Sequence, residues 1–319
     1  MATIADIKGK LRLPVIGAPL FIVSTPALVT AQCKAGVIGA FPALNARPQE
    51  ALDTWLTDIK AALAEHDAAH PDQPSAPFAV NQIVHRSNNR LMADMETIVK
   101  HEAPMVITSL GALPEIYEAV HSYGGIVMHD VIDNTFAKKA IDKGADGLIL
   151  VAAGAGGHAG VQSPFALMQE VREWFDGPIA LSGSIASGAS VLAAEAMGAD
   201  FAYVGSAFIA TQEANADNAY KQGIVDSAAA DIVYTNYFTG VHGNYLRPSI
   251  VNAGLDPDNL PVSDPSKMDF KSGGDSDAKV WKDIWGCGQG IGAVKSVSTV
   301  ADFVATMENE YREARERLT

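Results

Sequence analysis

The sequence is poor in cysteine, in clustered positive charge and in long hydrophobic runs. Cys33 and Cys287 are the only cysteines among 319 residues, so neither a disulfide framework nor a CxxC metal knuckle is available, and a reducing cytoplasm is the simplest setting. The formal net charge is −14 and no basic patch stands out, which excludes nucleic acid and anionic membrane surfaces as expected partners. No apolar run reaches the about 18 residues of a membrane span, and no apolar signal segment follows Met1.

Short apolar segments alternate with helix-length segments, such as 48–65, from residue 13 to about residue 224. The apolar segments are continuous, as expected of parallel strands that are covered on both faces. Eight such units in about 210 residues predict an α/β protein with a (β/α)8 TIM barrel. A doubly wound open sheet is the alternative, and the even count of eight favours the barrel. The expected strands are 13–19, 37–41, 78–83, 105–110, 126–131, 147–153, 179–182 and 201–204.

The regular alternation ends near residue 224. The following segment, up to about residue 290, is polar and rich in Gly, Pro, Asn and Asp, without strong periodicity. We expect residues 225–275 to form a small substrate-covering insert or lid at the barrel mouth, because long structureless excursions are uncommon inside a domain. The barrel then comprises residues 1–224 and 276–319 and is closed by a charged amphipathic helix over 298–317.

A glycine-rich loop carries the first candidate for chemistry. Residues 154–160 read Gly-Ala-Gly-Gly-His-Ala-Gly directly after an expected strand. The GxGxxA pattern superficially suits a dinucleotide, but such a turn must open a helix at once, and here Gln162, Ser163 and Pro164 intervene. We interpret the loop as a turn that presents His158 at the barrel mouth, as a general base or a hydrogen-bond donor to substrate. A surface histidine without a role is the alternative.

Two matching Gly-Ser pairs end the seventh and eighth expected strands. They are Gly183-Ser184 and Gly205-Ser206. In barrels the loops after these two strands commonly bind a phosphate, because glycine lets backbone N–H groups approach the anion and serine adds a donor. Ordinary tight turns are the alternative, although two such pairs on adjacent strands favour a phosphate site.

Together these residues resemble the nitronate monooxygenase (2-nitropropane dioxygenase) family of FMN-dependent TIM-barrel oxidoreductases. The resemblance covers about residues 13–294 and rests on Gly17-Ala-Pro-Leu, Gly156-Gly-His-Ala-Gly, the two Gly-Ser pairs with their strands, and Gly288-Gln-Gly. It implies FMN as the cofactor and His158 as the catalytic base. The residues that it implies at the cofactor are Ala18, Pro19, Leu20, Asn81, His129, Gly156, Gly157, Gly183, Ser184, Gly205, Ser206, Gln289 and Gly290.

The sequence departs from the family pattern in two places. Many members carry a Lys at the end of the fifth strand, where this chain has His129-Asp130. His129 could replace that cation only when it is protonated, and Asp130 would oppose it if it faced the ring. The His129-Asp130 pair would suit half of a metal site, but no third ligand is clustered near it in the sequence, so the sequence favours no metal. The first-strand motif ends in Leu20-Phe21 and lacks the usual Met.

The resemblance implies oxidation of alkyl nitronates with O2 to carbonyl compounds and nitrite. The alternative is an NAD(P)H-dependent FMN reductase of enoyl thioesters, carried on acyl carrier protein or CoA, or of quinones. A flavin-binding protein without turnover is a third hypothesis. The expected partners are a small-molecule substrate and O2, and the sequence leaves the oligomeric state, including a homodimer, open.

Overall fold

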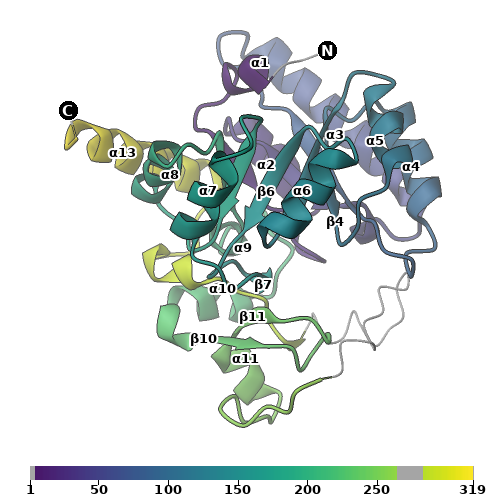
Figure 1. Cartoon of the computed structure of the whole chain (residues 1–319). Coiled ribbons are helices and arrows are strands. Elements are labelled where there is room, and N and C mark those ends of the chain that lie inside the picture. The colour runs from purple at the N-terminus through teal and green to yellow at the C-terminus, as the bar shows by residue number, and fades with distance from the viewer. Residues whose placement is uncertain (1–3, 264–282, 319) are drawn as a thin grey trace.

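Eight parallel strands form the central barrel (Figure 1). The computed structural model describes residues 4–263 and 283–318. The strands follow the order β1-β9-β8-β6-β5-β4-β3-β2, and the Gly17 N–H donates to the Ile38 carbonyl across 2.7 Å, which closes the ring. The TIM barrel predicted from the sequence is confirmed. The strands are β1 (Val15–Gly17), β2 (Gly39–Pro42), β3 (Phe78–Ile83), β4 (Met105–Ser109), β5 (Ile126–Val131), β6 (Gly147–Val151), β8 (Ile179–Ser182) and β9 (Phe201–Val204).

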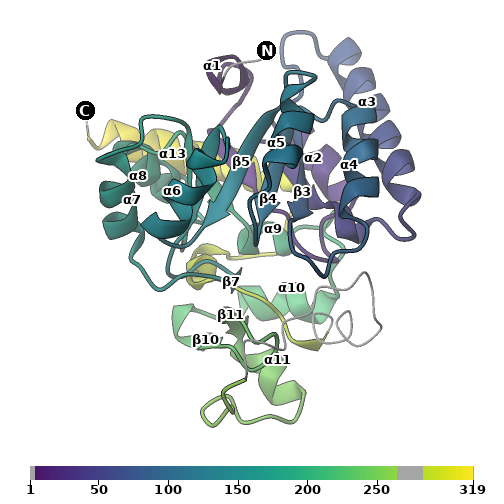
Figure 2. The same cartoon turned by 45° about the vertical axis from the view of Figure 1, so that its right-hand side comes forward.

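Helices cover the outside of the barrel (Figures 1 and 2). At the start of α6 the Asp133 side chain accepts a hydrogen bond from the Phe136 N–H, which satisfies an otherwise unpaired donor. The closing helix α13 packs against α8, where Glu310 accepts a hydrogen bond from the Gly188 N–H at 2.8 Å. The helices are α2 (Pro26–Lys34), α3 (Ala51–Ala69), α4 (Leu91–Lys100), α5 (Pro114–His121), α6 (Asn134–Asp142), α7 (Pro164–Arg172), α8 (Gly188–Ala196), α9 (Ser206–Ile209) and α13 (Val300–Glu316).

Side chains of the strands alternate between an inner and an outer core. On β4, Met105 and Ile107 lie in the cluster inside the barrel, whereas Val106 packs with the surrounding helices. On β5, Met128 faces inward and Val127 outward. Because both faces of each strand are buried, the sequence shows continuous apolar runs. The same alternation decides which polar side chains at the strand ends face the barrel mouth.

The amino-terminal end of the barrel is covered by α1 (Ile4–Lys8). Ile7 is 4% exposed and belongs to the inner cluster. Since the amino-terminal end is covered by apolar side chains, access to the barrel interior is at the carboxyl ends of the strands. In the described ranges, no helix is long and apolar enough to cross a membrane.

A three-stranded antiparallel sheet lies beyond the carboxyl ends of the barrel strands (Figures 1 and 2). Its middle strand pairs with a strand from the glycine-rich loop, so the barrel and the small sheet are joined by hydrogen bonds. Part of the predicted insert, 264–275, lies outside the described residues. The elements of this region are β7 (Gly157–His158), β10 (Ile232–Thr235), β11 (Gly243–Leu246), α10 (Asn218–Val225), α11 (Arg247–Asn252) and the 3-10 turns η2 (Ala229–Asp231) and η4 (Gln289–Ala293).

Candidate functional site

A cavity of about 840 Å³ lies at the carboxyl ends of the barrel strands. This volume is in the range of small-molecule sites, about 300–1,000 Å³. Thr239 and Gly240, from the segment between β10 and β11, line it together with barrel residues. Gln289 is the one residue of the predicted site that does not line the cavity, and its N–H donates to the Gly154 carbonyl at 2.9 Å. The predicted residues that line it are Ala18, Pro19, Leu20, Asn81, His129, Gly156, Gly157, His158, Gly183, Ser184, Gly205, Ser206 and Gly290.

His158 is held at the cavity wall by both its backbone and its ring. Its backbone pairs with Gly243 of β11, and its Nε2 lies 2.8 Å from Thr239 Oγ1. The Thr239 hydroxyl donates to the Val241 carbonyl at 3.1 Å, so its oxygen can accept the Nε2 proton. In this tautomer Nδ1 is the basic nitrogen. Burial lowers the pKa of His158 to about 4, so the imidazole is neutral near pH 7 and can accept a proton.

The two Gly-Ser pairs meet the glycine-rich loop and the segment after Cys287. Ser206 Oγ accepts a hydrogen bond from the Gly288 N–H at 2.8 Å. A Cβ atom on Gly156 would lie 2.8 Å from Gly288 N and 2.9 Å from Ser206 Oγ, closer than real Cβ contacts allow. Ser184 has φ of 59°, a left-handed conformation that is uncommon outside glycine. Gly156 therefore lets the segment after Cys287 pack closely on the glycine-rich loop, and both Gly-Ser pairs line the cavity beside this contact.

The inner layer of the mouth holds a chain of polar side chains. Asn81 Nδ2 donates to Ser109 Oγ at 2.8 Å, and Ser109 Oγ donates to Asp130 Oδ2 at 2.5 Å. Burial raises the pKa of Asp130 to about 7, although the Ser109 hydrogen bond opposes this shift. Ser109 and Asp130 were not among the predicted site residues. The sequence signal for Asp130 is the alternation of side chains along β5, which places it on the same inward face as Met128.

His129 lies on the opposite face of β5 from Asp130. Its Nδ1 lies 2.6 Å from Thr108 Oγ1 and 3.2 Å from the Tyr117 hydroxyl, so this nitrogen is directed toward the outer layer. Burial lowers the pKa of His129 to about 4, and the ring is therefore neutral at pH 7. Its place at the cofactor stays a prediction. Within the described ranges, no group of three or more His, Cys, Asp or Glu residues is arranged to hold a metal ion.

The Asn45 side chain is hydrogen-bonded to the backbone of the loop after β1, which lines the cavity. Its Oδ1 accepts from the Ile22 N–H at 2.9 Å, and its Nδ2 donates to the Leu20 and Ser24 carbonyls at 2.9 and 2.8 Å. Ile22 has φ of 66°, which β-branched residues rarely adopt. The hydrogen bonds of Asn45 thus hold a strained loop beside Leu20, one of the predicted cofactor residues. The sequence gives no local signal for this contact.

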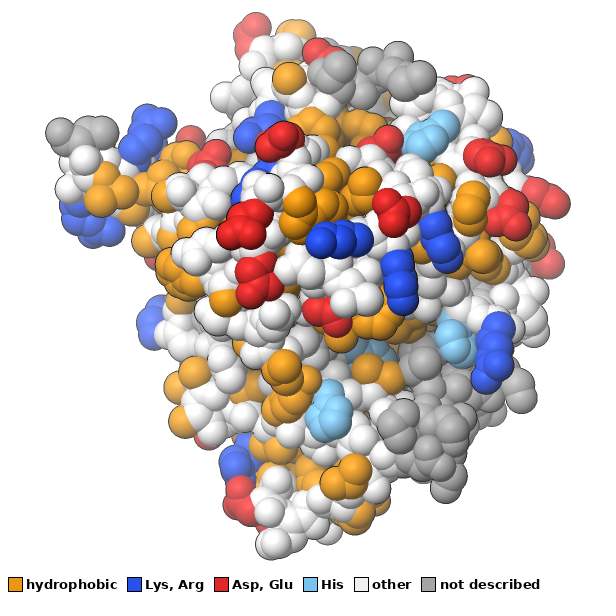
Figure 3. Space-filling model, in the orientation of Figure 1, with side chains coloured by type: hydrophobic (Ala, Val, Ile, Leu, Met, Phe, Trp, Pro, Cys, Tyr) orange, Lys and Arg blue, Asp and Glu red, His pale blue; other side chains and the backbone are white. Residues whose placement is uncertain are grey.

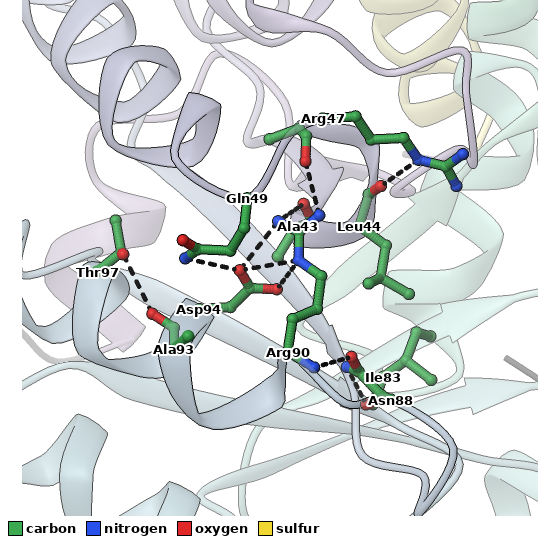
Figure 4. Close-up of polar contacts among 11 residues, drawn as sticks. Ala43, Leu44, Arg47, Gln49, Ile83, Asn88, Arg90, Ala93, Asp94 and Thr97 are labelled. Atoms are coloured by element: carbon green, nitrogen blue, oxygen red, sulfur yellow. Dashed lines mark hydrogen bonds and ion pairs between the residues drawn. The ribbon is translucent and has the colours of Figure 1, made fainter. Parts of the chain in front are cut away.

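The turn η1 (Ala43–Asn45) is itself held by a buried ion pair (Figure 4). Arg90 Nε lies 2.9 Å from Asp94 Oδ2, and its two other nitrogens donate to the Ala46 and Ala43 carbonyls at 2.7 and 3.2 Å. The Asp94 side chain is 0% exposed. These hydrogen bonds hold the turn η1, and with it Asn45, in place beside the cavity at the carboxyl ends of the strands.

Positive charges line the mouth of this otherwise acidic chain. Arg47, Lys139 and Lys143 belong to the cavity wall. The Arg47 guanidinium lies 5.4 Å from the centre of the Phe21 ring. Figure 3 shows Lys and Arg side chains among hydrophobic ones over the region of α6. Cations beside a cavity raise the local concentration of anionic ligands.

The chain resembles known proteins in both sequence and fold. The model of a family described as nitronate monooxygenase matches residues 4–310. The nitronate monooxygenase of Paraburkholderia phytofirmans is 27% identical over 348 residues, which cover 96% of this chain and 94% of that one. The structure of nitroalkane oxidase from Streptomyces ansochromogenes has a TM-score of 0.81 at 21% identity and covers 98% of this chain and 99% of its own. That of FabK from Thermotoga maritima has a TM-score of 0.74 at 20% identity, with 100% and 98% covered.

At identities near 20% the two solved structures support the fold alone, and they agree with the closed barrel. The family model carries the assignment because it spans almost the whole chain, including every residue of the cavity wall discussed above. The relative from Paraburkholderia is matched along nearly its full length as well. The chain therefore belongs to the nitronate monooxygenase family and is an oxidoreductase.

Proposed function

We propose that the protein is an FMN-dependent nitronate monooxygenase, which oxidises alkyl nitronates with O2 to carbonyl compounds and nitrite. The observation that carries the proposal is one cavity that is lined by both a neutral, half-buried His158 and the two Gly-Ser pairs. Membership of the family supports the choice of reaction. The cavity position, at the carboxyl ends of barrel strands, is where enzymes of this fold place their chemistry.

The cavity wall fits a flat ring with a phosphate tail. Both Gly-Ser pairs line the cavity, where small residues and serine hydroxyls let an anion come close to the backbone. The predicted insert would cover the substrate, since Thr239 lines the cavity from that side. Bound FMN would supply the capacity to take electrons from the substrate and pass them to O2. We assign Gly183, Ser184, Gly205 and Ser206 to the phosphate and Ala18, Pro19 and Leu20 to the ring.

His158 would act on the substrate through Nδ1. Because its imidazole is neutral at pH 7, it can remove a proton from the carbon of a neutral nitroalkane. When the substrate enters as a nitronate, its negative charge favours the protonated ring, which then donates a hydrogen bond to a nitronate oxygen. Thr239 would hold the ring in the required orientation through Nε2.

The test begins with the purified protein and its flavin absorbance. We expect bound or readily absorbed FMN, and O2 uptake with nitrite release when an alkyl nitronate is added. His158→Gln should retain FMN and lose oxidation of neutral nitroalkanes. A colourless protein that does not take up added FMN would contradict the proposal at its first step.

A second function, NAD(P)H-dependent reduction of an enoyl thioester or quinone, is favoured by the cations at the mouth. Arg47, Lys139 and Lys143 would suit the phosphates of CoA or of a nicotinamide dinucleotide. Anaerobic mixing separates the two functions. Bleaching of the flavin by NADH or NADPH supports the reductase, and bleaching by a nitronate without a response to nicotinamides supports the monooxygenase. An FMN-loaded protein that responds to neither would favour flavin binding without turnover.

A further inference from the structure

The floor of the cavity carries two hydroxyl groups to which the proposed function gives no role. Ser182 on β8 and Tyr203 on β9 line the cavity, and each residue is 7% exposed. Within residues 4–263 and 283–318 neither hydroxyl oxygen has a hydrogen-bond partner, and neither belongs to the unpaired side-chain atoms that are buried from solvent. Both oxygens therefore keep accessible surface at which a ligand in the cavity can form a hydrogen bond.

The strands place the two hydroxyl-bearing residues next to each other on the inner face of the barrel. Ser182 and Tyr203 are partners in the parallel register of β8 and β9. Tyr203 and Ala180 belong to the inner cluster, and Ser182 follows Ala180 by two positions, which keeps it on the same face. Adjacent strands lie about 4.8 Å apart, so one segment of a ligand can reach both residues.

Other polar groups of the floor form hydrogen bonds with one another. Asn81 donates both amide protons, one of them to Ser109, and Ser109 donates to Asp130. Burial and the nearby Asp130 raise the pKa of Tyr203 well above its ordinary value, so its hydroxyl keeps its proton at neutral pH. An open hydroxyl can both donate and accept a hydrogen bond, which suits a ligand that carries hydroxyl groups of its own.

Both residues lie just before the Gly-Ser pairs that we assign to the FMN phosphate. Ser182 directly precedes Gly183-Ser184, and one residue separates Tyr203 from Gly205-Ser206. At about 3.3 Å per residue, they lie within about 7–10 Å of the serines of these pairs. In FMN the hydroxyl-bearing ribityl chain is attached directly to the phosphate. A phosphate at the Gly-Ser pairs would therefore bring this chain to the part of the wall that carries the open hydroxyls.

We propose that Ser182 and Tyr203 form a polyol subsite, in which their hydroxyls hydrogen-bond the ribityl hydroxyls of FMN. The identity of the ligand rests on the proposed function. The subsite would hold the middle of the cofactor, between its phosphate and its ring. It would favour a flavin with a hydroxylated chain over one with a plain alkyl chain, because the alkyl chain would cover both hydroxyls and leave them unpaired.

The affinities of two flavins test the subsite. The probes are FMN and its phosphopentyl analogue, which keeps the ring and the phosphate but has hydrogen in place of the ribityl hydroxyls. Their dissociation constants are measured by flavin fluorescence on the wild type, Ser182→Ala and Tyr203→Phe. We expect the wild type to bind the analogue at least about tenfold more weakly than FMN. Each variant should reduce this preference by about 3–10-fold, through weaker binding of FMN and little change for the analogue.

Tyr237→Phe is the matched control. Tyr237 also lines the cavity, but it belongs to the segment between β10 and β11. Its replacement should leave the preference for FMN unchanged. Circular dichroism verifies that each variant is folded. The subsite is overturned if both Ser182→Ala and Tyr203→Phe keep the wild-type preference, or if they weaken FMN and the analogue equally, since an equal loss indicates altered packing and not a lost hydrogen bond.

The wild-type measurements separate this proposal from the proposed function. A wild type that binds neither flavin overturns the proposed function, and the subsite falls with it. A wild type that binds FMN and the analogue equally well retains the flavin site and overturns the subsite alone.

Discussion

Replacement of Arg90 by Met should lower the free energy of unfolding by about 3–5 kcal/mol, because Asp94 would become an unpaired buried charge. The Arg90 side chain is 10% exposed and that of Asp94 is 0% exposed, so water cannot take over the lost contacts. The Ala43 and Ala46 carbonyls lose their donors at the same time, at about 1 kcal/mol each. These losses place the expected effect toward the upper end of the range.

The assay is urea denaturation followed by circular dichroism, with a surface ion pair as the matched control. Lys100 contacts Asp53 at 2.6 Å, but the two side chains are 66% and 45% exposed. Lys100→Met should therefore cost less than about 1 kcal/mol. Adding Asp94→Asn to Arg90→Met should recover part of the loss, because the unpaired charge is removed. An Arg90→Met variant that loses no more than Lys100→Met would refute the reasoning.

Three further predictions concern the site. Thr239→Val removes the hydrogen-bond partner of His158 Nε2. In steady-state assays, the rate of oxidation of a neutral nitroalkane should therefore fall more than that of a preformed nitronate. Equal losses of the two rates would count against the His158 tautomer that is protonated on Nε2. Gly156→Ala puts a Cβ atom 2.8 Å from Gly288 N. The FMN dissociation constant, measured by fluorescence, should then rise at least about tenfold. An unchanged dissociation constant would contradict the assignment of this corner of the cavity to the FMN phosphate. Burial lowers the pKa of His129 in the folded protein to about 4, so the neutral ring contributes stability above the unfolded pKa of about 6.5, and this stability is lost as the pH falls from about 6.5 to about 4. In urea denaturation, the free energy of unfolding of His129→Asn should therefore fall less over this pH range than that of the wild type. An equal fall in both proteins would be the contrary result.

The barrel was predictable because its strands are local, continuous apolar segments that alternate with helix-length segments. The expected strand at 201–204 matches β9, and that at 126–131 matches β5. Helix ends were less well defined. The helix expected over 48–65 runs over 51–69, since Pro48 lies in a turn whose carbonyl accepts from the Ala51 N–H. Local sequence does not specify such turns closely.

The site residues that local sequence motifs mark could be predicted, whereas contacts between residues far apart in the sequence could not. His158 stands out because glycines flank it, but its partner Thr239 is 81 positions away in the chain. Asp130 was visible next to His129, yet the direction of its side chain could not be read from a strand that is apolar on both faces. Once Met128 is known to face inward, the alternation places Asp130 at the cavity.

The most direct test of the central claim is nitrite release by the FMN-loaded protein when an alkyl nitronate is supplied in air. We expect O2 uptake together with nitrite release, and a loss of at least about hundredfold in the oxidation of the parent nitroalkane by His158→Gln. An FMN-loaded wild type that releases no nitrite from nitronates, and whose flavin is instead bleached by NADH or NADPH, would contradict it.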